Sequence, residues 1–288
     1  MLGVFALAFA FLSGLSTIGD PDFGWQLARG RWIAQHHQVF TYDVLSYTVP
    51  GASAVYPPLG GLLLYWVFLL GGYKLLSWLC AISCVATVAL LLRRGSAFTA
   101  AMAILAVPFL AMRMVPRSEL FAILLFAAFV SLLWQNFQTS RAPLWLLPLL
   151  MALWVNIHFS FFSGFGLLAA FAGVEVLELP IAGERRHNAI QRLKREIPWF
   201  LATMAATLAN PWGWKIYKET ALHRRRARHL RQRMGAAAPE LDQPPRKLHL
   251  AQHERPRPRG VRNCRPDDRL RAARQPVGSS LPAAGSHV

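Results

Sequence analysis

The stretch that decides the fold is residues 1–22, which read MLGVFALAFAFLSGLSTIGDPD. Residues 1–19 contain no charged side chain, and two carboxylates, Asp20 and Asp22, then follow within three residues. An uncharged apolar segment of about 20 residues predicts a helix that spans a membrane. The segment lacks the basic start of a signal peptide, and Asp20-Pro21 is a poor cleavage context, so we expect a retained helix. The two carboxylates would then lie at the lipid boundary, within reach of water and of a lipid-borne substrate.

Apolar runs recur through the first 220 residues and predict an all-α, polytopic membrane helix bundle. A run at residues 59–70 is too short to cross a bilayer, so we expect a re-entrant or juxtamembrane helix there. Pro57-Pro58 suits the first turn of that helix, and Gly71-Gly72 is its expected end. The seven predicted spans are residues 2–19, 73–92, 97–113, 119–137, 143–157, 160–180 and 197–210.

The long first loop, residues 20–72, opens with a helix pattern of a different kind. Between residues 23 and 37, indole and aliphatic side chains alternate with polar ones at helical spacing. This pattern predicts an amphipathic juxtamembrane helix at the membrane interface. Arg29 and Arg31 on this helix are candidate contacts for lipid phosphate groups, and interfacial anchoring is the alternative interpretation.

The loops between the predicted spans alternate in charge. One set carries Arg93-Arg94, Arg141 and the arginine-rich stretch 184–196, and basic loops favour the cytoplasmic side. The other set carries the first loop and several unusual polar clusters. The pattern predicts an inner (plasma) membrane protein with a cytoplasmic N-terminus and with these clusters outside. Convergent polar groups at one end of a helical bundle are typical of a site.

Asp20 and Asp22 are the first candidate site residues. A carboxylate can take the proton of an acceptor hydroxyl, and a divalent cation such as Mg²⁺ or Mn²⁺ prefers oxygen ligands. We therefore predict that the pair acts as a general base, as metal ligands, or as both. The alternative is a helix-end cap and turn, since Asp-Pro favours turns.

A second cluster, Arg113, Arg117 and Glu119, lies between two predicted spans. The planar guanidinium of arginine can bind two phosphate oxygens, so both arginines are candidate phosphate-binding residues. Glu119 begins an apolar run, where an unpaired charge is costly, and it is the third candidate catalytic residue. An internal ion pair that joins two helices is the alternative.

Two asparagine-containing turns complete the predicted site. Asn156-Ile157-His158 joins two spans, and His158 is a ligand, a hydrogen-bond donor to a phosphate group, or a hydrogen-bonded structural residue. Asn210 begins the turn Asn-Pro-Trp-Gly, which is typical of a helix end. Asn156, His158 and Asn210 are candidate substrate-binding residues, with turn formation as the alternative for Asn210.

These motifs, in this order, resemble those of bacterial members of the GT-C superfamily of polytopic glycosyltransferases. The resemblance covers residues 1–220. The stretch YPPLGGLLLYW at 56–66 also resembles a segment of the protein mannosyltransferase and aminoarabinose transferase branch, although Tyr56 replaces a lysine of the latter and Ser118 a proline. The other matching segments are DPDFGWQLARGRWI (20–33), RSELF (117–121), LWLLPLLMALWVNIH (144–158) and NPWGW (210–214).

The resemblance implies an enzyme of about seven helices that transfers a sugar, with inversion, from a polyprenyl-phosphate-linked donor on the extracytoplasmic face. Asp20 or Asp22 matches the first-loop carboxylate of the family, and Glu119 falls where a second acidic residue often lies. Arg117 and His158 match a family arginine and histidine. The implied partners are membrane lipids and the lipid-linked donor, with an unspecified acceptor. A transporter or flippase-like protein and a non-catalytic membrane protein remain as alternatives.

Residues 221–288 differ from the rest in composition. They hold no aromatic residue, 16 basic and 5 acidic side chains, whereas the first 220 residues hold all 34 aromatic, 15 basic and 9 acidic ones. This composition predicts disorder. The excess of arginine over lysine indicates an out-of-frame translation of a GC-rich gene, and therefore a truncated transferase. A tail that binds RNA or anionic lipid is the alternative, although nucleic acid is not an expected partner.

Overall fold

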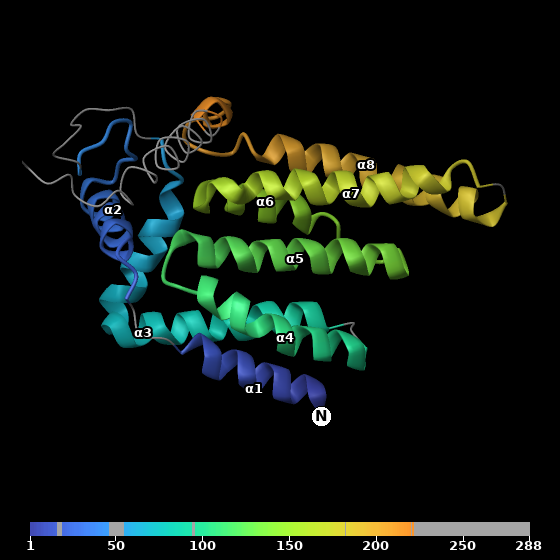
Figure 1. Cartoon of the computed structure of the whole chain (residues 1–288). Helices are drawn as coiled ribbons and strands as arrows, with labels where there is room; N and C mark the ends of the chain where they lie inside the picture. The colour runs from blue at the N-terminus through green and yellow to red at the C-terminus, as the bar shows by residue number, and fades with distance from the viewer. Residues whose placement is uncertain (16–18, 46–54, 94–95, 182, 220, 222–288) are drawn as a thin grey trace, which may run out of the picture. The chain divides into compact units, whose positions relative to one another are not determined.

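The computed structural model describes residues 1–15, 19–45, 55–93, 96–181, 183–219 and 221. Helices dominate these residues (Figure 1). The predicted disordered tail, apart from Ala221, lies outside the described residues, so its disorder stays a prediction. The elements are α1 (Leu2–Gly14), α2 (Phe23–His36), α3 (Pro58–Leu92), α4 (Ala97–Arg113), α5 (Ser118–Thr139), α6 (Leu146–Ile157), η1 (Phe159–Phe161), α7 (Phe162–Glu178) and α8 (Glu184–Ala206).

The predicted helical fold with helices able to span a membrane is confirmed, whereas the predicted number of seven spans stays a prediction. Three helices are long and apolar enough to cross a membrane, namely α3, α5 and the continuous stretch Phe159–Glu178 of η1 and α7. Helices α1, α4 and α6 are apolar but shorter. Helix α8 differs most from the prediction, because it begins at Glu184 rather than at residue 197. Its first half is rich in Glu, Arg, Gln and Lys, which form helices well without being apolar.

Helix α3 changes direction at Gly71 and Gly72, where the backbone leaves helical geometry. Gly72 has φ +59° and ψ −149°, a conformation that residues with a Cβ rarely adopt. The predicted end of the short helix at this glycine pair is therefore confirmed. The break separates a first half, which packs against α2, from a second half that runs with the other long helices (Figure 1).

Two apolar cores lie between the helices. One core joins α5, α6, α7 and α8 around Phe129, Trp154 and Phe161, which are buried. The rings of Phe129 and Trp154 meet edge to face, with centroids 5.4 Å apart. The other core joins α1, α3, α4 and the start of α5, and four of its eight buried residues are alanine or cysteine, such as Ala10 and Cys84. Small residues let the backbones of membrane helices approach closely.

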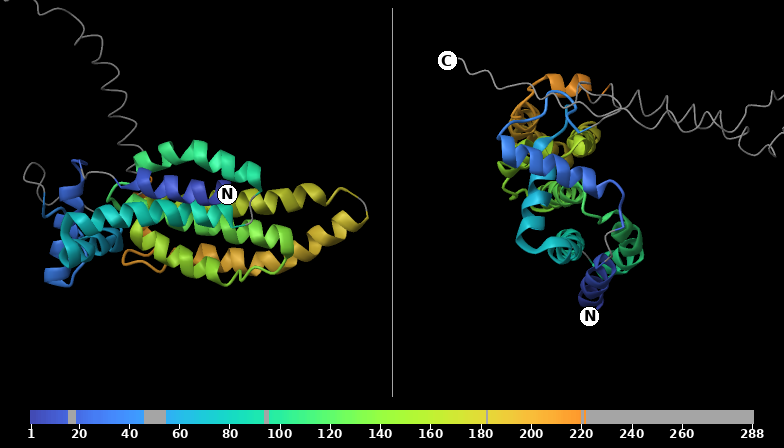
Figure 2. Two further views of the ribbon diagram at one scale, coloured as in Figure 1. Left: turned by 90° about the horizontal axis from the view of Figure 1, so that it is seen from below. Right: turned by 90° about the vertical axis from the view of Figure 1, so that its left-hand side faces the viewer.

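Helix α2 lies across one end of the long helices (Figure 2). Its close approach depends on glycine, since a Cβ on Gly30 would lie 2.1 Å from the backbone oxygen of Gly61. A Cβ on the neighbouring Gly60 would lie 2.3 Å from the Cβ of Ser118 and 2.9 Å from the backbone oxygen of Ile157. These glycines therefore bring α2, the starts of α3 and α5, and the end of α6 to one place.

Replacing Gly30 by alanine is expected to push α2 away from α3 and to lower the free energy of unfolding by about 1–3 kcal/mol, as overpacking does. The clash is with backbone, which cannot rotate aside. Gly24→Ala is the matched control, because Gly24 is on the same helix and nothing lies within 4 Å of its added Cβ. Thermal unfolding in detergent micelles compares the two variants. Equal melting temperatures would contradict the close α2–α3 contact.

Candidate functional site

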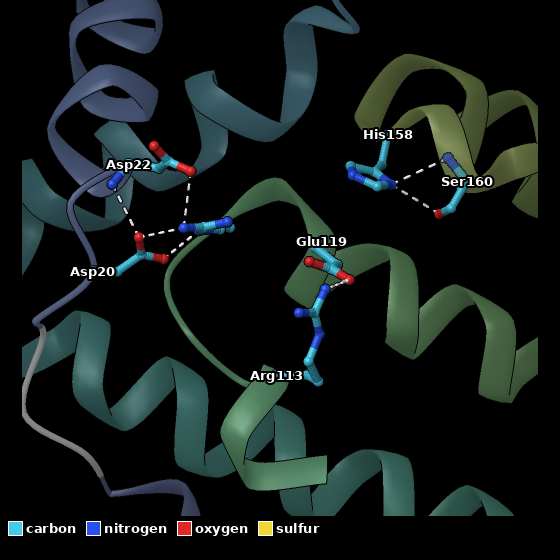
Figure 3. A network of polar contacts seen from close by, with 7 residues as sticks. Asp20, Asp22, Arg113, Glu119, His158 and Ser160 are labelled. Carbon is cyan, nitrogen blue, oxygen red and sulfur yellow. Dashed lines mark hydrogen bonds and ion pairs between the residues drawn. The ribbon is translucent and has the colours of Figure 1, made fainter. Parts of the chain in front are cut away.

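An arginine and two aspartates form the centre of the site. Arg117 precedes α5, and its Nε donates to Oδ2 of Asp20. Its Nη2 donates to Oδ1 of Asp20 at 2.5 Å and lies 2.8 Å from Oδ2 of Asp22. Figure 3 shows the two aspartates side by side, with Asp22 at the start of α2. One guanidinium therefore joins the loop before α2 to the start of α5.

The two aspartates have different surroundings. The side chain of Asp20 is only 7% exposed, whereas that of Asp22 is 64% exposed. Asp20 also accepts a hydrogen bond from the backbone N–H of Asp22 at 2.9 Å, so it forms the turn that the sequence offered as an alternative. The hydrogen bond from Arg117 lowers the pKa of Asp20 below its ordinary value. Asp20 is thus an ionised anchor, and Asp22 is the carboxylate that solvent and a substrate can reach.

A second ion pair lies beside the first. Arg113 at the end of α4 donates through Nη2 to Oε1 of Glu119 in the first turn of α5 (Figure 3). The side chain of Arg113 is mostly exposed, whereas that of Glu119 is partly buried. This pair is the internal ion pair between helices that the sequence allowed, and it holds Glu119 close to Arg117.

His158 lies between α6 and η1, with its ring fixed by Ser160 (Figure 3). The backbone N–H of Ser160 donates to Nδ1 of His158 at 3.1 Å, and the Ser160 hydroxyl lies 2.9 Å from the same atom. The proton of the neutral ring is therefore on Nε2. Burial lowers the pKa of His158 below its ordinary 6.5, against a smaller opposing effect of Glu119, so the ring is neutral at pH 7.

A cleft of about 490 Å³ brings these groups together. Of the predicted residues, Asp22, Arg117, Glu119 and His158 share its wall. Arg117 and Glu119 also line a neighbouring hollow of about 430 Å³ with Asp20 and Arg113. The predicted convergence of these polar groups at one end of the helices is therefore observed. The full lining of the main cleft is Asp22, Trp25, Gln26, Tyr56, Arg117, Ser118, Glu119 and His158.

Arg29 has a packing role instead of the predicted phosphate contact. It is 4% exposed, and its guanidinium lies over the rings of Trp25 and Tyr56, at 4.6 and 4.5 Å from their centroids. Its Nη2 donates to the backbone oxygen of Pro57 at 3.1 Å, and burial lowers its pKa to about 10. Arg31 lies on the exposed side of α2 and does not line the cleft. Burial therefore separates Arg29 from the predicted phosphate contact, whereas the predicted contact of the exposed Arg31 with lipid phosphate stays a prediction.

Asn156 and Asn210 form hydrogen bonds with the backbone of neighbouring segments. The Nδ2 group of Asn156 donates to the backbone oxygen of Ala209 at 2.6 Å, which fastens the end of α6 to the chain after α8. Asn210 accepts from the backbone N–H of Trp212 at 2.9 Å and donates to the oxygen of Gly213 at 3.1 Å. These bonds form the predicted turn and leave neither asparagine in the cleft wall.

The predicted metal role of Asp20 and Asp22 does not fit this arrangement. The Arg117 guanidinium contacts both carboxylates, so it holds the position that a shared Mg²⁺ or Mn²⁺ would need. In the described part of the chain, no group of three or more His, Cys, Asp or Glu side chains is placed to hold a metal ion. We therefore treat the pair as an arginine-bound carboxylate site.

Four lining residues were not predicted as site residues, namely Trp25, Gln26, Tyr56 and Ser118. Gln26 is 9% exposed, and its Oε1 has no hydrogen-bond partner among the described residues. A buried acceptor that lines a cleft needs a donor from elsewhere. The signal in the sequence is spacing, because Trp25 and Gln26 lie three and four residues after Asp22 and so share its helix face.

No family model, curated protein or solved structure matches the chain.

Proposed function

We propose that the protein is a glycosyltransferase of the GT-C type that spans the inner membrane seven times, with its N-terminus in the cytoplasm. It transfers a sugar from a polyprenyl-phosphate-linked donor to an acceptor on the extracytoplasmic face, with inversion. The observation that carries the proposal is one cleft at the ends of apolar helices in which an exposed carboxylate, Asp22, lies beside an arginine and a neutral histidine.

In the proposed reaction, Asp22 acts as the base that takes the proton of the acceptor hydroxyl. The acceptor hydroxyl attacks the anomeric carbon from the face opposite the phosphate, and its proton passes to Asp22. The bond between the anomeric carbon and the phosphate oxygen breaks, and polyprenyl phosphate leaves with the bonding electrons. Asp22 suits the base because it is exposed in the cleft, whereas both oxygens of Asp20 are bound by Arg117.

The leaving phosphate gains negative charge, which cationic and N–H donors stabilise. Arg117 lines the cleft and supplies a permanently charged fork, and His158 supplies the N–H of Nε2 from a neutral ring. The rings of Trp25 and Tyr56 form an apolar wall for the sugar, and the unpaired Oε1 of Gln26 accepts from a sugar hydroxyl. The donor's lipid chain extends along the apolar helices, which end at this cleft.

The Asp22→Asn variant tests the proposal. We expect transfer to fall by about 10²–10⁴-fold, the usual contribution of a positioned acid or base, with the fold intact because Asp22 is exposed. The measurement is release of polyprenyl phosphate by purified protein in nanodiscs supplied with polyprenyl-phosphate sugars. Glu184→Gln, an exposed carboxylate at the start of α8, is the matched control. Equal release by wild type and Asp22→Asn would leave the transporter or non-catalytic alternative.

A further inference from the structure

A second cleft lies at the opposite end of α5 from the proposed active site. Its volume is about 540 Å³, and it lies between the last turns of α5 and the first half of α8. Helix α5 has 22 residues, so the two ends are about 33 Å apart, close to the thickness of a bilayer core. The proposed sugar transfer uses none of its residues. The polar lining includes Asn136, Ser140, Asn188, Gln191, Arg192 and Arg195.

Beside this cleft lie two buried oxygen atoms that accept no hydrogen bond from any described residue. Asn136 is 1% exposed, and its Nδ2 donates to Oε1 of Glu196 at 2.5 Å. Among the described residues, Oδ1 of Asn136 and Oε2 of Glu196 have no hydrogen-bond partner. Glu196 is itself 3% exposed. Buried acceptors are nearly always paired, and burial raises the pKa of Glu196 to about 7, so a cationic donor at this position would keep the Glu196 carboxylate ionised.

The same cleft wall holds a cation, Arg195, whose nearby carboxylate, Glu196, does not pair with it directly. Arg195 donates through Nη2 to the neutral backbone oxygen of Ala142 at 2.8 Å, and it has no ion pair with any described residue. Arg192 differs, because Glu175 at 2.7 Å and Glu178 at 2.5 Å both pair with it. Arg195 is therefore the guanidinium that a ligand anion can use.

We propose that this cleft binds a group in which a protonated primary amine stands beside a phosphate, as in the headgroup of phosphatidylethanolamine. The ammonium donates to Oδ1 of Asn136 beside the Glu196 carboxylate, and the phosphate binds Arg195. The charges favour a cation, since Glu196 lies near Arg192 and Arg195, and Arg192 also pairs with Glu175 and Glu178, so in this part of the described chain three carboxylates share two guanidiniums. A single-charge anion alone would leave the acceptors of Asn136 and Glu196 unpaired.

A membrane lipid is the source that the position favours. Two of the candidate spans, α5 and the stretch Phe159–Glu178, end near this cleft, and headgroups lie at the depth where spans end. Glu178, at the end of the second span, is joined through Arg192 to the cleft wall. A headgroup can therefore enter the cleft while its acyl chains stay beside the apolar helices.

Native mass spectrometry of the full chain in detergent, titrated with phosphatidylethanolamine or phosphatidylglycerol, tests the inference. We expect phosphatidylethanolamine to bind about tenfold more tightly, because only it offers a charge-assisted hydrogen bond from an amine. Glu196→Gln should remove this preference, and Arg195→Gln should weaken both lipids. Lys194→Gln is the matched control, since Lys194 is exposed on the same helix outside the cleft.

The outcomes separate the lipid from a soluble ligand. If free phosphoethanolamine bound with the same affinity as phosphatidylethanolamine, the amine–phosphate chemistry would be upheld and the ligand would be a soluble compound. Equal binding of the two lipids, or no effect of Arg195→Gln relative to Lys194→Gln, would overturn the proposal. If Glu196→Gln does not fold, Arg195→Gln decides the question alone. Sugar transfer is not part of this readout, so failure here leaves the proposed function untouched.

Discussion

Arg117→Gln is expected to reduce sugar transfer by about 10²–10³-fold, the usual loss when one donor to a developing anion is removed. The substitution has two consequences in the structure. It removes the cation to which the proposed mechanism assigns the leaving phosphate, and it releases Asp20 and Asp22 from the guanidinium that contacts both of them. The measurement is release of polyprenyl phosphate under saturating donor, with kcat and KM determined separately.

Arg117→Lys distinguishes charge from geometry. Lysine keeps the positive charge but cannot form two parallel hydrogen bonds to Asp20, so we expect only partial recovery of the rate. Arg141→Gln, which removes an exposed arginine between α5 and α6, is the control and should match wild type. If Arg117→Gln retained wild-type kcat, Arg117 would be excluded from the transition state and the phosphate role would pass to another donor.

Arg117→Gln is also expected to change how the stability of the protein depends on pH. The hydrogen bond from Arg117 lowers the pKa of Asp20 in the folded state below its ordinary 3.8. Its stabilising contribution is therefore complete above pH 3.8 and is lost as the pH falls through the lowered pKa. In Arg117→Gln this contribution is absent, so the difference in stability between wild type and variant should shrink below pH 4. Acid titration followed by tryptophan fluorescence measures this difference.

Sequence patterns predicted the helices and the meeting of the polar groups, because both follow from local properties. An apolar run of residues favours a helix through its local pattern, and the polar residues that follow it lie at the end of that helix. Alternation of basic loops then assigns Asp22, Glu119 and His158 to the same end. The structure has them around one cleft. The break of α3 at Gly71-Gly72 was equally predictable, since glycine pairs end short helices.

The wrong predictions for Arg29 and Asn156 have the same physical cause, which is pairing over long sequence separations. Arg29 and Arg117 are alike in sequence, yet the ring of Tyr56 and the oxygen of Pro57 bury the first. Asn156 is fastened to the backbone of Ala209, 53 residues away. No local pattern contains such partners. The start of α8 was missed for a different reason, because a search for apolar spans passes over a charged helix.

The second large effect concerns the buried ion pairs between α7 and α8. Replacing Arg192 by methionine is expected to lower the free energy of unfolding by about 3–5 kcal/mol, because it leaves a buried carboxylate without its partner. Glu175 is 1% exposed, and both of its oxygens accept from Nε of Arg192 at 2.7 Å. Methionine keeps an apolar stem near Phe137, over which the guanidinium lies at 5.6 Å. The loss can therefore be assigned to charge rather than to packing.

A double variant separates the value of the pair from the cost of breaking it. Two apolar residues in place of a buried ion pair are often neutral for stability, so Arg192→Met with Glu175→Met should recover most of the loss. Arg185→Met, on the exposed first turn of the same helix, should change stability by less than about 0.5 kcal/mol. Equilibrium unfolding in mixed micelles gives the free energy of unfolding of the wild type and of the three variants. If the double variant were as unstable as Arg192→Met, the unpaired charge of Glu175 would not explain the loss of stability. The loss would then come from Glu178, the other carboxylate that pairs with Arg192.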